Sequence, residues 1–260
     1  MRDYKLIDVA VALLASVVCS CLLQAQSDKS PQTAESRKSR ASASTPDLSG
    51  FWGPGARQGL RWDVSGDLPM TPWAAEKYKA ARPPFGPNAT FEDINDPVQL
   101  HCDPPGIPRI YNYPWQMTLI QTPRIVYILY EFSRMWRSVA MDRDHPKDPD
   151  STWLGDSIGR YDGDALVVDT VGFNDKTWLD HPGHPHSDAL HIIERFRRLN
   201  RDTLEVLITV DDPKTYTRSF TGRRLFELST SPMGETLCSL SENESFKKEI
   251  MDPTVGSAGK

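Results

Sequence analysis

Two runs of strand-forming residues flank one tight turn in the stretch Asp156-Ser-Ile-Gly-Arg-Tyr-Asp-Gly-Asp-Ala-Leu-Val-Val-Asp-Thr-Val171. Aspartate and glycine tolerate the positive φ of a primed turn, so the Asp162-Gly163 pair is a strong β-hairpin signal. The stretch therefore predicts an antiparallel hairpin with strands at 156–162 and 165–171.

Apolar and polar residues also alternate on both sides of this hairpin, from Trp115 onward. This is the period of half-buried strands, and it predicts further strands at 116–121, 124–132, 135–141, 189–198, 203–210, 215–220 and 223–228. Turn residues between them indicate an antiparallel meander, and no repeat of the length typical of propellers or solenoids is visible. Closure removes exposed sheet edges, so we expect a mainly β fold closed as a lipocalin-like barrel that can hold one ligand.

The chain before these strands divides into segments of different composition. Residues 1–25 have a weakly basic start and a short apolar run, which indicates a signal peptide; lipidation at Cys21 and an uncleaved anchor are the alternatives. Residues 26–45 predict a disordered tether to a single β-rich domain at 46–260. Prolines abound at 53–114, which predicts a long wrap around the barrel with one short helix over 71–81.

Charge and cysteine count narrow the partners and the compartment. The formal net charge of −5 over 260 residues gives no reason to expect nucleic acid as a partner. Without the signal peptide, Cys102 and Cys238 remain as an even pair, which predicts a disulfide in a secreted or periplasmic protein. Two separate buried thiols are the alternative. We expect no membrane association beyond a lipid anchor at Cys21.

Several long motifs resemble the pattern of a large family of secreted bacterial proteins, and the similarity covers nearly all of the chain beyond the tether. These motifs are Asp47–Trp52, Cys102–Arg109, Trp153–Thr170 and Pro185–Phe196. The resemblance implies no established activity. The opening Leu-Ser-Gly-Phe-Trp is also similar to the first strand of lipocalin-like, calycin-type barrels.

Four of the six histidines lie in the segment 181–191, which leads into the predicted strand 189–198. In that strand Glu194 falls in phase with the apolar residues, so its carboxylate should point into the interior, where desolvation raises a carboxyl pKa unless a cation such as Arg137 or Arg218 pairs with it. His186 precedes the same strand and has an ordinary pKa near 6.5, which suits a general acid or base. We therefore predict His186 and Glu194 as catalytic residues.

His184 and His186 also form an H-x-H pair that could bind a divalent metal. In extended chain both side chains point to the same side, and His181 or Glu194 could complete the ligands around an open water position. A solvated loop rich in proline and histidine is the alternative. The chain holds none of the common nucleotide-binding, hydrolase or paired-cysteine motifs, so no other cofactor is expected.

Three further carboxylates are candidate members of the same site. Asp169 and Glu131 fall in phase with apolar neighbours, and a structural ion pair with an arginine such as Arg137 or Arg218 is the favoured interpretation. Asp142 lies in an acidic turn after strand 135–141 and could join a catalytic site at the barrel mouth. A solvated turn is the alternative, because no EF-hand spacing is present.

Aromatic residues are plentiful, and a pocket for a cyclic or apolar molecule needs aromatic walls with a few polar groups. We predict Trp136, Trp153, Tyr127 and Arg218 as substrate-binding residues, with core or loop anchoring as the alternative. The sequence thus favours a secreted small-molecule-binding barrel, with a preference for an acid-base enzyme of the lyase, isomerase or hydrolase type. A non-catalytic carrier and a metal-dependent enzyme are the competing hypotheses.

Overall fold

The computed structural model of the chain describes residues 45–55, 61–62, 66–86, 88–90 and 93–241. The predicted signal peptide, the lipidation position Cys21 and almost all of the tether lie outside the described residues. Across the part that is described, no helix is both long enough and apolar enough to cross a membrane.

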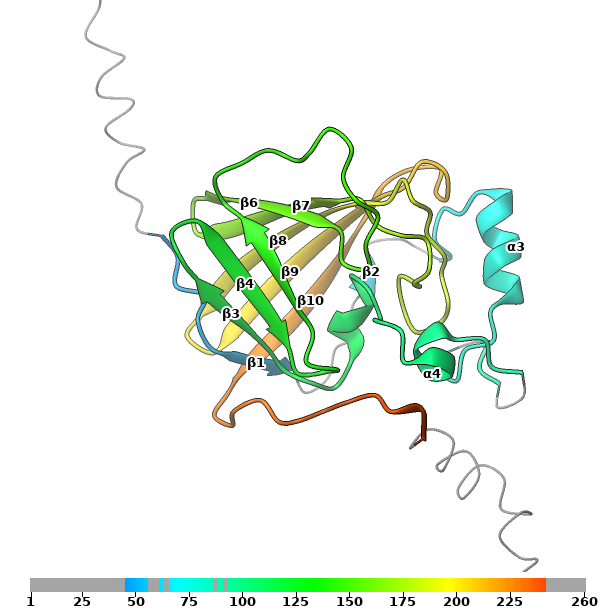
Figure 1. Cartoon of the computed structure of the whole chain (residues 1–260), viewed down its shortest axis with the longest axis horizontal. Helices are drawn as coiled ribbons and strands as arrows, with labels where there is room; N and C mark the ends of the chain where they lie inside the picture. The colour runs from blue at the N-terminus through cyan, green and yellow to red at the C-terminus, as the bar shows by residue number, and fades with distance from the viewer. Residues whose placement is uncertain (1–44, 56–60, 63–65, 87, 91–92, 242–260) are drawn as a thin grey trace, which may run out of the picture. The chain divides into compact units, whose positions relative to one another are not determined.

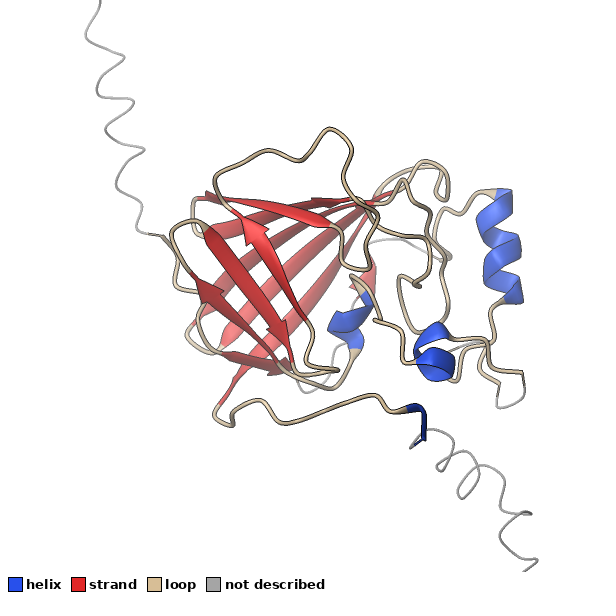
Figure 2. Cartoon of the chain, viewed as in Figure 1, coloured by secondary structure: helices blue, strands red, loops and turns tan. Residues whose placement is uncertain are grey.

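Nine strands close into a barrel in the described part of the chain (Figure 1, Figure 2). In sheet order they are β1 (Phe51–Pro54), β3 (Met117–Gln121), β4 (Ile125–Tyr130), β5 (Trp136–Ala140), β6 (Asp156–Asp162), β7 (Ala165–Val171), β8 (His191–Asn200), β9 (Thr203–Asp211) and β10 (Phe220–Ser229). β1 closes the ring because it pairs with both β3 and β10. The short β2 (Arg61–Trp62) adds to β10. The predicted closed β fold is confirmed.

The β6–β7 hairpin has the predicted bounds, with Asp162 opposite Ala165 and Gly163 at φ +62° in the turn. One junction departs from the predicted antiparallel meander, because β5 and β6 run parallel. A parallel neighbour requires a long crossover, which residues 141–155 supply as a loop.

The predicted strand at 215–220 is wrong. Where two strands were predicted, at 215–220 and 223–228, the structure has the single strand β10. The cause is Asp212, whose backbone carbonyl accepts the N–H groups of Thr215 and Tyr216 at 3.0 and 2.7 Å. Its carboxylate also accepts the N–H of Lys214 at 3.2 Å. These bonds fold the chain into a turn where alternation alone predicted a strand.

Two α-helices and a 3₁₀ turn lie between β2 and β3 in the chain. Thr71 caps the predicted helix, α3 (Pro72–Ala80). A second helix, α4 (Pro97–His101), was not predicted, although Asp96 followed by Pro97 is a helix-start signal, because five residues are too few to show periodicity. The 3₁₀ turn η1 covers Arg109–Asn112. α3 and α4 both lie on the same side of the barrel (Figure 1).

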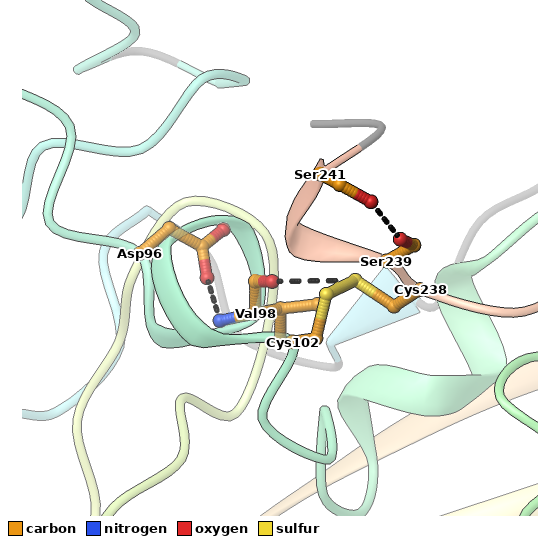
Figure 3. The surroundings of a disulfide bond; sticks show 6 residues. All are labelled: Asp96, Val98, Cys102, Cys238, Ser239 and Ser241. Carbon is orange, nitrogen blue, oxygen red and sulfur yellow. Dashed lines mark hydrogen bonds between the residues drawn. A yellow bond between two sulfur atoms is a disulfide. The ribbon is translucent and has the colours of Figure 1, made fainter. Parts of the chain in front are cut away.

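The predicted disulfide between Cys102 and Cys238 is confirmed, with the two Cα atoms 5.4 Å apart. Figure 3 shows it joining the end of α4 to the segment that follows β10. That segment also pairs with the barrel, because Thr236 forms a parallel bridge with Phe132. The disulfide therefore ties α4 to a C-terminal segment that is itself attached to the barrel.

Side chains fill the described barrel interior. Trp52, Phe196 and Phe226 are among its largest fully buried members. A cavity beside η1, lined by residues such as Tyr111 and Tyr130, measures about 10 Å³, which is room for roughly one water molecule. This cavity is too small for an organic ligand.

Candidate functional site

A groove lies outside the barrel, between α3 and the loop 174–188. Its main pocket has a volume of about 380 Å³ and is lined by Trp73, Lys77, Ala80, Ala81, Asn95, Pro97, Asp175, Lys176, Thr177, Trp178, Gly183, Pro185 and His186. A second pocket of about 370 Å³ shares Trp73 and Asp175 with it and adds Ser187, Asp188 and Lys214. We call the two pockets together the α3 groove.

His186 lines this groove although only 2% of its surface is exposed. Its Nδ1 lies 3.1 Å from the carbonyl oxygen of Ser187, which can only accept, so Nδ1 carries the proton. Burial lowers the pKa of His186 and keeps the ring neutral, which leaves Nε2 as an acceptor. The hydroxyl of Thr177 donates to Nε2 at 2.6 Å. The groove therefore contains a neutral base bonded to a hydroxyl group.

Two aspartates hold the loop that carries His186. Asp212, which follows β9, accepts both the backbone N–H and the hydroxyl of Ser187 at 2.7 Å. Asp180 accepts the backbone N–H of Gly183 at 3.2 Å, inside the loop. The Tyr216 hydroxyl donates to the carbonyl of Pro185 at 2.7 Å. The loop is thus fixed on both sides of His186 by buried hydrogen bonds.

Thr177 is fixed from its other side by the segment before η1. Gly106 has φ +73°, and a Cβ at that position would lie 2.6 Å from the Thr177 hydroxyl oxygen. Only glycine permits this close approach without displacing the threonine. The Thr177 hydroxyl is therefore held between the Gly106 backbone and the His186 ring.

Glu194 points into the barrel interior as predicted and is fully buried. The Arg137 guanidinium donates to its carboxylate at 2.6 Å. The Tyr111 hydroxyl also donates to Glu194, since burial raises the pKa of Tyr111 well above its usual range and keeps the hydroxyl protonated. Among the described contacts, none joins Glu194 to His186. The predicted pair is separated because the histidine loop folds against α3 instead of over β8, with Gly183 packed on Ala81.

The two histidines of the H-x-H pair also have different partners. The Nδ1 atom of His184 lies 2.7 Å from Asp180 Oδ2, and its ring stacks on Tyr78 with the centroids 4.1 Å apart. His186 bonds Thr177, as described above. In the described part of the chain, no three His, Cys, Asp or Glu side chains gather as a metal-binding group. The divalent-metal hypothesis stays a prediction.

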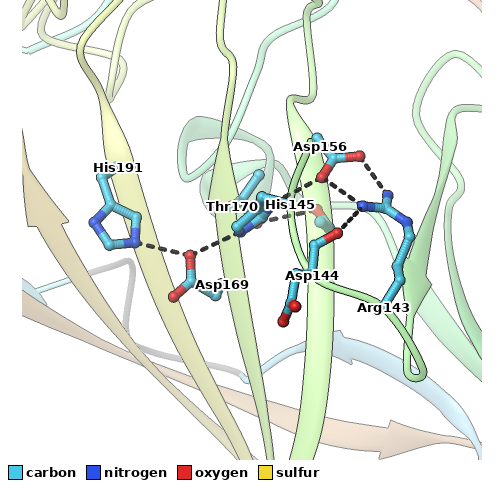
Figure 4. Close-up of polar contacts among 8 residues, drawn as sticks. Arg143, Asp144, His145, Asp156, Asp169, Thr170 and His191 are labelled. Carbon is cyan, nitrogen blue, oxygen red and sulfur yellow. Dashed lines mark hydrogen bonds and ion pairs between the residues drawn. The ribbon is translucent and has the colours of Figure 1, made fainter. Parts of the chain in front are cut away.

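Asp169 lies on the outer face of the barrel, so its predicted inward phase is wrong. Its Oδ1 atom is 3.1 Å from His145 Nε2 and 2.8 Å from His191 Nε2 (Figure 4). β7 is apolar on both faces, with Leu166 and Val168 buried in the core and Val167 buried outside it, so alternation could not set its phase.

Glu131 is likewise not directed inward, because β4 ends at Tyr130 and its buried residues are those of the other phase. The Glu131 carboxylate instead accepts the backbone N–H of Gln116 at 2.9 Å. β4, like β7, carries apolar residues on both faces, which explains the wrong prediction.

The other predicted site residues are not among those that line the groove. Trp136 is 59% exposed, and its ring contacts Tyr127 on the outer face of the sheet with the centroids 6.0 Å apart. Arg218 is exposed and donates to the neighbouring Ser219 carbonyl. Asp142 forms an exposed ion pair, and Trp153 packs under the Lys176 ammonium group. Of the predicted site residues, His186 alone is among those that line the α3 groove.

Sequence reasoning missed Thr177, which no motif marks, and the groove walls Trp73 and Trp178. The cap at Thr71 predicted α3, which carries Trp73, but it gave no sign that the loop with Thr177 and Trp178 lies against this helix. Comparison of the chain with known protein families, curated proteins and solved structures found no match. The resemblance to a family of secreted bacterial proteins stays a prediction.

Proposed function

We propose that the α3 groove binds a small organic molecule and that His186 acts on it as the acid-base group of an enzyme. The observation that carries this proposal is the neutral His186, whose Nε2 holds the Thr177 hydroxyl at the wall of a pocket of about 380 Å³. A base and a hydroxyl within hydrogen-bond reach of each other are typical of acid-base and nucleophilic sites. Thr177 takes the place beside His186 that sequence reasoning assigned to Glu194.

The lining of the groove favours a particular kind of ligand. Trp73 and Trp178 offer aromatic surface for a planar or cyclic body. Lys77 and Lys176 outnumber the one aspartate of the main pocket, Asp175, which favours a neutral or anionic ligand. A cyclic molecule with a carbonyl or carboxylate group fits this chemistry.

The same proposal includes the compartment and the fold class. A disulfide of this kind is typical of oxidising compartments, which supports a secreted or periplasmic location. A closed barrel with the buried Trp52 on its first strand supports the lipocalin-like classification.

Tryptophan fluorescence tests the binding proposal, with a panel of aromatic and alicyclic carboxylates and esters as probes. Trp73→Ala should weaken binding of any active probe by about tenfold, because removal of an aromatic wall costs about 1 to 2 kcal/mol. Trp136→Ala is the matched control, since Trp136 is exposed and is not among the residues that line the groove. Equal losses in both variants, or no binding by any probe, would overturn the proposal.

A non-catalytic carrier is the second candidate, favoured by the same tryptophan walls. His186→Gln separates the two functions. A carrier would keep its ligand affinity in this variant and show no turnover in the wild type. An enzyme would bind but turn over its ligand at least about 100-fold more slowly without the base.

A further inference from the structure

We propose that Thr177 is a nucleophile and that the α3 groove hydrolyses an ester or lactone through an acyl-threonine intermediate. This inference rests on the proposed function, because it assigns a reaction to the same groove. It goes further by naming the bond that is cleaved and the atom that attacks it.

Three groups form the array that such chemistry requires. The Thr177 hydroxyl oxygen lies 2.6 Å from His186 Nε2, and His186 Nδ1 lies 3.1 Å from the Ser187 carbonyl oxygen. In hydrolases with a serine, histidine and aspartate, the imidazole has the same polarity, with Nδ1–H held by an acceptor and Nε2 facing the nucleophile. Here a backbone carbonyl occupies the orienting position of the carboxylate.

The orienting carbonyl is itself held in place. The Ser187 carbonyl oxygen also accepts the backbone N–H of Leu190 at 3.2 Å. Asp212 binds the N–H and the hydroxyl of Ser187, so the residue that carries this carbonyl is held by buried hydrogen bonds as well. The neutral imidazole needs no counterion, and the pKa of His186, lowered by burial, keeps it available as a base near neutral pH. Asp212 is therefore a positioning residue for the array.

The groove also supplies what a carbonyl substrate needs. Thr177 is 5% exposed and lines the groove together with His186, so the reactive pair borders the space that a ligand fills. Lys77 and Lys176 line the same pocket. A cation at the wall stabilises the negative charge that develops on a carbonyl oxygen under attack.

The reaction balances without any further reagent except water. Thr177 Oγ1 bonds to the acyl carbon while His186 Nε2 takes the hydroxyl proton. When the tetrahedral intermediate collapses, the bond to the leaving alcohol breaks and His186 returns the proton to that alcohol. Water then attacks the acyl-threonine with His186 as base, which releases a carboxylic acid and restores the Thr177 hydroxyl.

The test treats the full-length protein with p-nitrophenyl acetate and with a β-lactone probe, followed by intact mass measurement and peptide mapping. The expected result is one acyl adduct on Thr177 in the wild type and in Thr177→Ser, and none in Thr177→Val. His186→Gln should acylate at least about 100-fold more slowly. Thr217→Val, which removes a hydroxyl that donates to Pro69 outside the groove, should label like the wild type.

Each outcome decides the proposal. An adduct only at other residues, equal labelling of Thr177→Val, or no adduct in a folded wild-type protein would overturn it. Circular dichroism and urea unfolding establish that each variant is folded, and Thr177→Ser keeps the test meaningful if Thr177→Val does not fold. If no adduct forms while ligand binding still depends on Trp73, acyl transfer is excluded and the proposed binding groove stands.

Discussion

The buried titratable groups of the barrel interior and of the α3 groove have different kinds of partner: a charged one in the interior and a neutral one in the groove. In the interior, Glu194 is matched by Arg137 and the Tyr111 hydroxyl, and the cavity nearby measures only about 10 Å³. In the groove, the neutral His186 has a hydroxyl as its partner at the wall of a pocket of about 380 Å³. A buried charge requires a partner that satisfies it, whereas a neutral base at a pocket wall stays available for chemistry. Inward direction alone therefore does not mark a catalytic carboxylate.

Removal of one partner of the interior pair should have the largest effect on stability. Glu194→Ala leaves the Arg137 guanidinium buried without its carboxylate, so the free energy of unfolding should fall by about 3 to 5 kcal/mol in urea titrations. Asp142→Ala is the control, because it breaks the exposed ion pair with Arg124 and should cost less than about 1 kcal/mol. Similar losses in both variants would contradict a distinct role for the interior pair.

Loss of the disulfide should destabilise α4, beside the groove, more than the strands of the barrel. Replacement of Cys102 and Cys238 by serine opens a loop of 136 residues and should lower the free energy of unfolding by about 2 to 4 kcal/mol. Because α4 contributes Pro97 to the groove, hydrogen exchange should accelerate in α4 more than in β8. Faster exchange in β8 than in α4 would show that the two regions are not separable in this way.

Alanine substitutions at Gly106 and Gly163 separate the cost of close packing from the cost of backbone strain. Gly106 and Gly163 both have positive φ, so alanine should cost roughly 1 kcal/mol at either position. At Gly106 the new Cβ would also meet Thr177, whereas Gly163 has nothing within 4 Å. Gly106→Ala should therefore lose about 1 to 2 kcal/mol more than Gly163→Ala in thermal or urea unfolding. Equal losses would mean that Thr177 moves aside freely.

The smallest expected effect is a pH dependence of the free energy of unfolding that arises from His186 in the groove. Burial lowers the pKa of His186 in the folded protein, so below about pH 6.5 unfolded chains take up a proton that the folded protein does not. The free energy of unfolding should therefore decrease as the pH falls below that value, and His186→Gln should remove part of this decrease. Urea titrations between pH 5 and pH 8, on the wild type and the variant, measure the difference; identical slopes would contradict a buried neutral His186.

Local sequence signals predicted much of the fold. Alternation and turn residues predicted the β6–β7 hairpin and most of the other strands, because a strand's period depends on its own residues. Thr71 and Pro72 predicted α3 for the same reason. The signals failed where two phases were equally apolar, as in β7, and where one side chain reshaped the backbone, as Asp212 does after β9.

The candidate site divides in the same way. By itself the sequence determined that Glu194 faces inward and that Cys102 and Cys238 can pair. It also determined that His186 belongs to a segment with a high density of histidines, which can act as acids, bases or metal ligands. Only the tertiary structure decided the partners. It placed Thr177 beside His186 and Arg137 beside Glu194, residues 9 and 57 positions away. The physical reason is that a periodic pattern reports which face a side chain takes, whereas its partner depends on how loops and distant strands pack.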